Sequence, residues 1–315
     1  MGRDTLKMFP GEIRDLLKKA NLKPELLQEI RLRVNAPMMI VYRGEEFIMG
    51  QDGTLNGKSA YYVSPACIRT TVDQIAGYSL YAYEEEVRQG YITIQGGHRV
   101  GIAGKVVFEG EKIKSISHIS FVNIRFAHQM IGCASKILPY VAAEGNICHT
   151  LIISPPRCGK TTILRDLIRQ ISNGNEERRG VSVGVVDERS EIGGCYHGIP
   201  QNDVGIRTDI LDGCPKAEGM MMLIRSMSPA VIAVDEIGSY DDIHAIETVL
   251  SCGCKLLATV HGSSIEDIRR KPLLERLVRE KVFERYILLG HKQHIGEIQS
   301  IFDERGSCLY HGACG

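Results

Sequence analysis

The chain has 315 residues, with 38 Lys or Arg against 38 Asp or Glu, so its formal net charge is zero. This length suits two domains, each with a sizeable core, and fractions of 43% apolar and 24% charged residues are ordinary for a soluble globular protein. The charge balance disfavours a dedicated nucleic-acid binder, which usually carries a basic excess.

Neither an export signal nor a membrane segment is expected. The opening residues 1–6 contain no apolar h-region, and no apolar run approaches the length of about 18 residues that a membrane helix needs. The ten cysteines include no C-x-x-C pair, which disfavours zinc and thiol-redox sites and predicts reduced, core-filling thiols. We therefore expect a cytosolic protein that reaches a membrane only through protein partners.

The first half of the chain predicts a small mixed α/β domain built from hairpins. Apolar periodicity indicates helices at residues 5–20, 24–28, 64–88 and 133–144. Alternating or apolar runs indicate strands at residues 29–34, 38–42, 91–94, 98–107 and 119–126, with charged turns at 43–46 and 109–115. Since the helix at 133–144 leads into a different pattern, we place a boundary near residue 145 and predict domains 1–145 and 146–315.

The second half alternates between strands and helices. Strands are predicted at residues 149–154, 181–186, 231–234 and 255–260, and helices at 161–170, 217–226 and 243–250. Strands this apolar, separated by helices, indicate a mostly parallel sheet that is covered on both faces. The expected fold is therefore α/β, with the mixed first domain followed by a mostly parallel second domain.

A phosphate-binding loop is predicted where a buried strand passes into a helix, at Ser154-Pro155-Pro156-Arg157-Cys158-Gly159-Lys160-Thr161-Thr162. Backbone N–H groups at a helix N-terminus bind anions, Lys160 reaches the β- and γ-phosphates, and Thr161 offers its hydroxyl to Mg²⁺. Ser154 replaces the first glycine of G-x-x-x-x-G-K-[ST]. Because Ser154 ends a strand, it needs no positive φ, and we expect the loop to form.

A second acidic motif follows an apolar strand at residues 231–234. Asp235 is expected to hold Mg²⁺ through its water shell, and Glu236 to polarise the attacking water. Together with the phosphate loop, these two acids predict a RecA-like P-loop NTPase domain that hydrolyses ATP with Mg²⁺.

Further runs make the chain resemble the additional-strand family of P-loop ATPases, which contains secretion and pilus motors. Residues 185–192 look like the family's acidic box, and residues 258–264 look like its histidine box. The resemblance narrows to the stage III sporulation AA proteins, because it extends to the phosphate loop and to the runs at residues 29–34, 96–104 and 120–125. This resemblance covers nearly the whole chain.

The resemblance implies roles for several residues. Glu188 and Glu191 in the acidic box compete with Glu236 for the role of general base, and the sequence does not rank them. His261 is expected to sense the γ-phosphate and transmit its loss.

Arginines from the first domain are expected on the nucleotide of a neighbouring subunit, where they offset charge that develops in phosphoryl transfer. Arg99 and Arg125 are the first candidates, with Arg31 and Arg33 behind them.

The resemblance also implies a hexameric ring in the mother-cell cytosol of an endospore-forming bacterium. The ring would sit at the base of a channel between mother cell and forespore, bound to channel proteins without direct lipid insertion. The alternatives are a RecA-like nucleic-acid motor or nucleotide-gated nucleic-acid-binding protein, and a nucleotide-dependent scaffold with vestigial hydrolysis. An aromatic content of 6% without Trp disfavours stacking on single strands, so nucleic acid is an unlikely partner.

Overall fold

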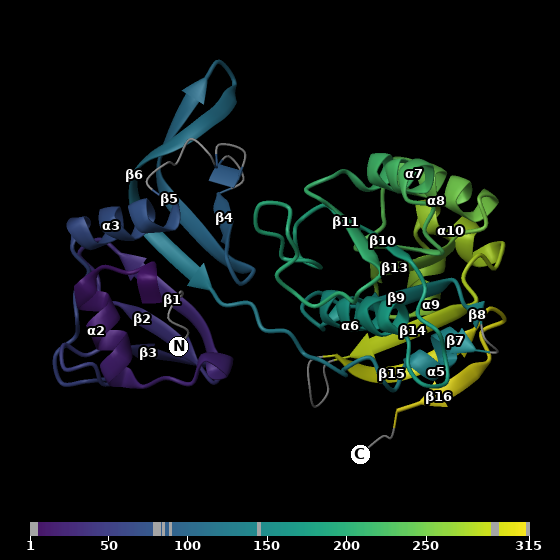
Figure 1. The fold of residues 1–315 in the computed structure, drawn as a ribbon, viewed down its shortest axis with the longest axis horizontal. Coiled ribbons are helices and arrows are strands. Elements are labelled where there is room, and N and C mark those ends of the chain that lie inside the picture. The colour runs from purple at the N-terminus through teal and green to yellow at the C-terminus, as the bar shows by residue number, and fades with distance from the viewer. Residues whose placement is uncertain are drawn as a thin grey trace. The chain divides into compact units, whose positions relative to one another are not determined.

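The computed structural model describes residues 6–77, 83, 86–87, 90–143, 146–290 and 296–312. The chain divides into two compact units, Met1–His128 and Gln129–Gly315 (Figure 1). The boundary that the sequence places at residue 145 lies outside the described residues. Ala134, Ile137 and Val141 pack in the core of the second unit, so the segment that the sequence assigned to the end of the first domain packs with the second.

The described residues of the first unit form a six-stranded antiparallel sheet in the order β3-β2-β1-β6-β5-β4. Its strands are β1 Leu27–Arg33, β2 Met39–Tyr42, β3 Glu45–Ile48, β4 Tyr91–Ile94, β5 His98–Glu109 and β6 Lys112–Arg125. The helices are α2 Gly11–Ala20, the 3-10 turn η1 Pro24–Leu26, and α3 Pro65–Ile75. Buried side chains from both α-helices share one apolar core with alternate residues of the strands.

The start of α3 follows from its local sequence. The Ser64 hydroxyl accepts the N–H of Cys67 at 3.1 Å, and Pro65 fills the first turn, so α3 begins there. Beyond α3, much of the helix predicted for residues 64–88 lies outside the described residues, as does residue 5 of the first predicted helix.

The β5–β6 hairpin is longer than the sequence indicated and projects past the other strands of its sheet (Figure 1). The charged turn expected within residues 109–115 is confined to Gly110 and Glu111, and the other residues end β5 or begin β6, with Glu109 paired to Lys112. The hairpin bends at Gly104, where an added Cβ would lie 2.7 Å from the carbonyl oxygen of His118. Only glycine allows this close backbone approach.

The described residues of the second unit form an eight-stranded sheet in the order β11-β10-β12-β13-β9-β14-β15-β16. In this order, each pair of neighbours from β11 to β14 is parallel. The pairings of β14 with β15 and of β15 with β16 are antiparallel. The strands are β9 Thr150–Ser154, β10 Val183–Asp187, β11 Thr208–Asp212, β12 Val231–Val234, β13 Lys255–His261, β14 Arg285–Gly290, β15 Glu297–Asp303 and β16 Cys308–His311. A separate pair is β7 Ala142–Ala143 with β8 Asn146–Ile147.

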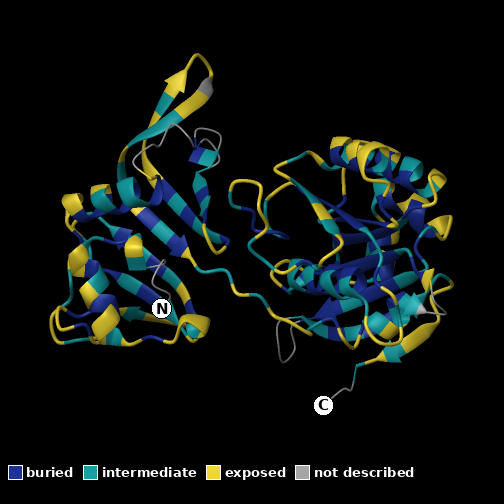
Figure 2. Ribbon diagram, viewed as in Figure 1, coloured by how far each residue is buried: buried dark blue, intermediate teal, exposed yellow. Residues whose placement is uncertain are grey.

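Helices cover both faces of this sheet. They are α5 Leu138–Val141, α6 Lys160–Asn173, α7 Lys216–Ser226, α8 Tyr240–Ser251, α9 Ile265–Arg269 and α10 Pro272–Arg279. Ile152 and Ala233 share a core with α6, whereas their neighbours Ile153 and Val234 share a core with α7, α8 and α10. Figure 2 shows the central strands buried and the outer sides of α7 and α8 exposed. The prediction of a mixed first domain and a mostly parallel α/β second domain is confirmed.

Other details differ from the sequence-based expectation. The helix predicted at residues 133–144 contracts to α5, because Ala142–Ala143 pairs as a strand and Asp166 accepts the N–H groups of Gly132 and Ala134. The strands β11 and β14 to β16 and the helices α9 and α10 were not predicted. Among the described helices, none combines the length and apolar character needed to cross a bilayer.

Candidate nucleotide site

The phosphate loop connects the fully buried strand β9 to the 14-residue helix α6. Ser154, at the position of the first consensus glycine, is the last residue of β9 and is 1% exposed. Its hydroxyl donates to the carbonyl oxygen of Pro155 at 2.9 Å. Gly159 is left-handed, with φ of 82°, as is Arg157, with φ of 61°. The loop therefore turns at its far end, and its first position needs only extended backbone.

Lys160 begins α6 and is 5% exposed. Its ammonium group donates to the carbonyl oxygen of Pro155 at 3.3 Å and to Nδ1 of His261 at 3.0 Å. Burial lowers the pKa of Lys160, and the negative charges of Asp235 and Glu236 oppose that shift. A buried cation with neutral partners is suited to receiving an anion.

Asp235 joins the second acidic motif to the phosphate loop. The hydroxyl of Thr161 donates to Oδ2 of Asp235 at 2.6 Å, and the hydroxyl of Thr259 donates to Oδ1. The strands β9, β13 and β12 are neighbours in the sheet, so their carboxyl ends bring these side chains together. Hydroxyl and carboxylate oxygens are the hard donors that Mg²⁺ prefers, and this donor set fits that ion.

Glu236 lies at the centre of a chain of polar contacts. Its Oε1 is 2.7 Å from Nε2 of His261, and its Oε2 is 3.0 Å from Arg189. Because an ammonium group can only donate, Nδ1 of His261 accepts from Lys160, and Nε2 is the ring nitrogen that faces Glu236. The backbone of Glu236 is left-handed, with φ of 56°, a conformation that costs a non-glycine residue on the order of 1 kcal/mol.

The acidic box forms a tight loop around a buried carboxylate. Asp187 ends β10, is 2% exposed, and accepts the N–H groups of Glu191, Ile192 and Gly193 at 2.8, 2.9 and 2.8 Å. Burial raises the pKa of Asp187, and the three N–H donors oppose that shift. Arg165 of α6 donates to the carbonyl oxygens of Ile192 and Glu191. The loop is thus fastened to the helix that carries the phosphate-binding lysine.

The three candidate acids have different surroundings. Glu188 is paired with Lys216 at the start of α7. Glu191 is one of the charges that act on Lys160, while Glu236 contacts the lysine's histidine partner directly.

The candidate arginines lie in the first unit, on the sheet that β1, β5 and β6 share. Arg99 and Arg125 are opposite each other in register. Arg125 pairs with Glu29 at 2.9 Å, Arg31 pairs with the same carboxylate at 2.7 Å, and the Arg99 guanidinium lies 4.8 Å from the Tyr91 ring centroid. Within the first unit, the structure therefore brings Arg99, Arg125 and Arg31 onto neighbouring strands of one sheet.

Sequence reasoning missed several residues that organise the site: Arg165, Asp187, Arg189, Lys216 and Thr259. Asp187, Arg189 and Thr259 lie inside the two boxes and were visible as motif members without a role. Arg165 belongs to the phosphate-loop run that carries the family resemblance, but no role was predicted for it. Nothing local marks Lys216. The partners of both residues lie more than twenty residues away.

The family model described as sporulation stage III, protein AA matches residues 2–309. A curated relative, stage III sporulation protein AA of Bacillus subtilis strain 168, is 43% identical over 283 residues, which cover 90% of this chain and 89% of the relative. The chain belongs to the stage III sporulation protein AA family. The resemblance drawn from the sequence is confirmed.

Solved structures with a similar fold come from secretion and pilus systems. The Legionella pneumophila ATPase DotB matches with a TM-score of 0.54 and 15% identity, covering 88% of this chain and 75% of that one. The pilus retraction motor PilT, solved with bound ADP, matches with a TM-score of 0.56 and 12% identity, covering 87% and 76%. At such identities the likeness shows the fold alone, so this member of a sporulation family has the fold of secretion and pilus ATPases.

Proposed function

We propose that the chain hydrolyses ATP at residues 154–162 and uses the energy to power or gate a secretion-like channel between mother cell and forespore. The observation that carries the proposal is the continuous chain Lys160–His261–Glu236, which links the phosphate loop to an acid at the end of β12. Beside it, Thr161 and Asp235 form an oxygen donor pair. A chance G-K-T sequence after a strand would not assemble these partners.

Each residue of the candidate nucleotide site would have a separate role in hydrolysis. Lys160 would leave His261 for the phosphates, and the N-terminal N–H groups of α6 would hold the remaining phosphate oxygens. Thr161 and Asp235 would hold Mg²⁺, which supplies charge neutralisation on the phosphates. Glu236 would accept the proton of the attacking water. When Lys160 leaves, His261 loses its donor, so its hydrogen bonds report the presence of the γ-phosphate.

Glu236 is our first choice for the general base. It is hydrogen-bonded to His261, which contacts the phosphate-loop lysine Lys160, whereas Glu188 pairs with Lys216 of α7, outside the phosphate loop. Glu191, whose charge acts on Lys160, is the second choice.

We further propose a hexameric ring in the mother-cell cytosol, held at the membranes by channel proteins. Family membership and the fold shared with secretion and pilus ATPases support this assembly. In the ring, Arg99 and Arg125 would act on the nucleotide of the neighbouring subunit. Arg125 is available for this role because its side chain is 67% exposed despite its pairing with Glu29.

Steady-state release of phosphate from ATP tests the activity. We expect Mg²⁺-dependent hydrolysis that Lys160→Ala abolishes, because the buried ammonium group is lost, and that Lys136→Ala leaves unchanged, because Lys136 is exposed outside the site. Single-stranded DNA should not alter the rate. Strong stimulation by DNA would favour the nucleic-acid motor, and normal sporulation with Lys160→Ala would favour the scaffold without active hydrolysis.

A further inference from the structure

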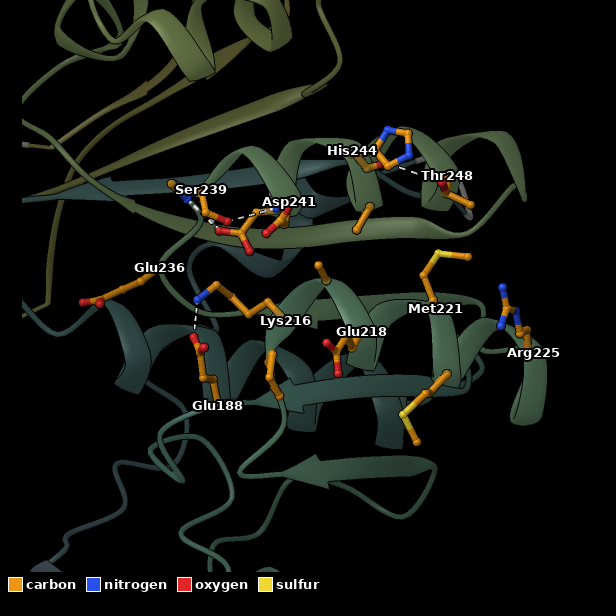
Figure 3. A pocket seen from close by; sticks show the side chains of 16 residues that line it. Glu188, Lys216, Glu218, Met221, Arg225, Glu236, Ser239, Asp241, His244 and Thr248 are labelled. Carbon is orange, nitrogen blue, oxygen red and sulfur yellow. Dashed lines mark hydrogen bonds and ion pairs between the residues drawn. The ribbon is translucent and has the colours of Figure 1, made fainter. Parts of the chain in front are cut away.

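A groove of about 860 Å³ runs between α7 and α8 in the second unit (Figure 3). One end is formed by Glu188 and Glu236, two of the three candidate acids of the nucleotide site. The remainder extends along the two helices, which have 11 and 12 residues. At about 1.5 Å per residue they offer a trough on the order of 16 Å long, or about three helical turns. None of the roles assigned to the nucleotide site uses this part of the groove.

The walls of the trough have an apolar component. Figure 3 shows Met221 of α7 pointing into the space between the two helices. Met222 and Ala245 also line the groove, and Met222 is 52% exposed. Methionine side chains are flexible and polarisable, and they are frequent on surfaces that accept apolar side chains of a partner.

Several charged side chains near the inner end of the groove are already occupied by partners within the chain. Lys216 is paired with Glu188. Asp242 is occupied by the capping box of α8, where it accepts the N–H groups of Gly238 and Ser239 at 3.0 Å each.

The acids that remain are Glu218 on α7 and Asp241 on α8. Both are exposed, and neither side chain forms a hydrogen bond or ion pair with any residue that the structure describes. Figure 3 shows them on opposite sides of the groove, with Arg225 at its outer end. The groove thus has an acidic inner half.

We propose that this groove docks a basic amphipathic helix of a protein partner. Lysine or arginine side chains of that helix would lie between Glu218 and Asp241, and its apolar side chains would pack on Met221. Laying the apolar face of a helix into a groove is a common mode of recognition, and complementary charge favours this partner over an acidic one.

A docked helix would affect the nucleotide site through the ion pair between Lys216 and Glu188. A basic side chain at the inner end competes with Lys216 for Glu188 and lies beside Glu236, so an occupied groove changes the rate of hydrolysis. This consequence rests on the proposed function, whereas the docking itself does not.

Fluorescence anisotropy with labelled model peptides tests the docking on the full chain. The probe is a peptide of about 18 residues, or five helical turns, with leucine on one face and lysine on the other. A second peptide carries glutamate in place of lysine. We expect the lysine peptide to bind and the glutamate peptide not to bind.

Charge reversal locates the site. The double substitution Glu218→Lys with Asp241→Lys should weaken binding by about tenfold or more, because attraction becomes repulsion. The control is Glu176→Lys with Glu177→Lys, which changes the net charge equally at an exposed loop on the opposite end of β10 and should change binding by less than about twofold. Met221→Ser should weaken binding without changing charge.

Three results would overturn the proposal. The lysine peptide could fail to bind, or the control could weaken binding as much as the groove variant, which indicates diffuse charge attraction. The wild-type chain could also self-associate in a way that the groove variant abolishes, which would mean that a second copy covers the groove. Lys160→Ala should lose hydrolysis and still bind the peptide, so failure of docking and failure of hydrolysis are separate outcomes.

Discussion

Glu236 carries the most specific chemical assignment in the site. Glu236→Gln keeps the shape of the side chain and removes its basicity, so kcat for ATP should fall by about 10²- to 10⁴-fold while KM changes little. Glu188→Gln should have a much smaller effect, because Glu188 pairs with Lys216 of α7, whereas Glu236 contacts His261, the partner of Lys160. Steady-state kinetics of both variants would contradict the assignment if Glu188→Gln proved the more damaging.

His98 gives the first unit a specific pH dependence. Burial, with a smaller contribution from the charge of His128, lowers the pKa of His98 from 6.5 to about 4. Below pH 6.5 the unfolded chain binds a proton that the folded chain excludes, so stability present above pH 6.5 is lost as the pH falls toward about 4. The loss is at most about 3 kcal/mol.

Urea denaturation across this pH window measures the effect. His98→Asn keeps an acceptor for the N–H of Ala127, which His98 Nδ1 now accepts at 3.1 Å, and should flatten the pH dependence of the unfolding midpoint. His118→Asn is the control, because His118 is exposed on β6. Equal pH profiles for the two variants would rule out His98 as the titrating group.

At the residue level, motifs predicted Lys160, Thr161 and Asp235 because strand ends of a parallel sheet meet at one edge. The sequence did not predict the pairing of Lys216 with Glu188 or of Arg189 with Glu236. Each of these pairs joins segments whose separation is set by loops, and loop paths leave no periodic signal. The sequence therefore left the competition among the three acids open.

Helix α6 and the acidic-box loop act as one element because Arg165 joins them. Arg165→Ala should release the carbonyl oxygens of Glu191 and Ile192, displace Glu191 and lower kcat by roughly tenfold, with nucleotide affinity largely kept. Arg165→Lys should restore part of the rate, since it keeps one donor. A fall in ATP affinity with unchanged kcat would show instead that Arg165 supports the phosphate loop alone.

Element prediction succeeded for the buried central strands of the second unit, but it missed α10, although its buried Leu274, Leu277 and Val278 recur with helical spacing. The strands β9, β10, β12 and β13 are apolar and were predicted in place, whereas the edge strand β11, which carries two aspartates, was not predicted. The helix predicted at residues 133–144 was wrong because its apolar residues pack from turns that Asp166 holds. Residues 112–118, which are mostly polar, form a strand in the projecting hairpin, and they show no strict apolar alternation that would predict it.

At the scale of the whole molecule, we propose a hexameric assembly in which Arg99 and Arg125 of one chain act on the nucleotide of its neighbour. Light scattering with ATP and Mg²⁺ should give the mass of six chains. A monomer at concentrations well above micromolar would argue against the ring.

Mixed assemblies test whether the arginines act between subunits. Chains with Lys160→Ala keep both arginines, and chains with Arg99→Ala and Arg125→Ala keep the phosphate loop. Each should be inactive alone, and a mixture should recover part of the wild-type rate of phosphate release, because a complete site then forms at some interfaces. No recovery in mixtures that demonstrably co-assemble would indicate that the arginines act within their own chain or not at all.

The most direct test of the central claim is a crystal structure of the chain with Mg²⁺ and a non-hydrolysable ATP analogue. We expect the phosphates in the loop at residues 154–162, Lys160 moved from His261 onto them, Thr161 on the metal, and Glu236 within hydrogen-bond distance of the water in line with the γ-phosphate. Phosphates bound elsewhere, or Lys160 still on His261 with the analogue in place, would contradict the account.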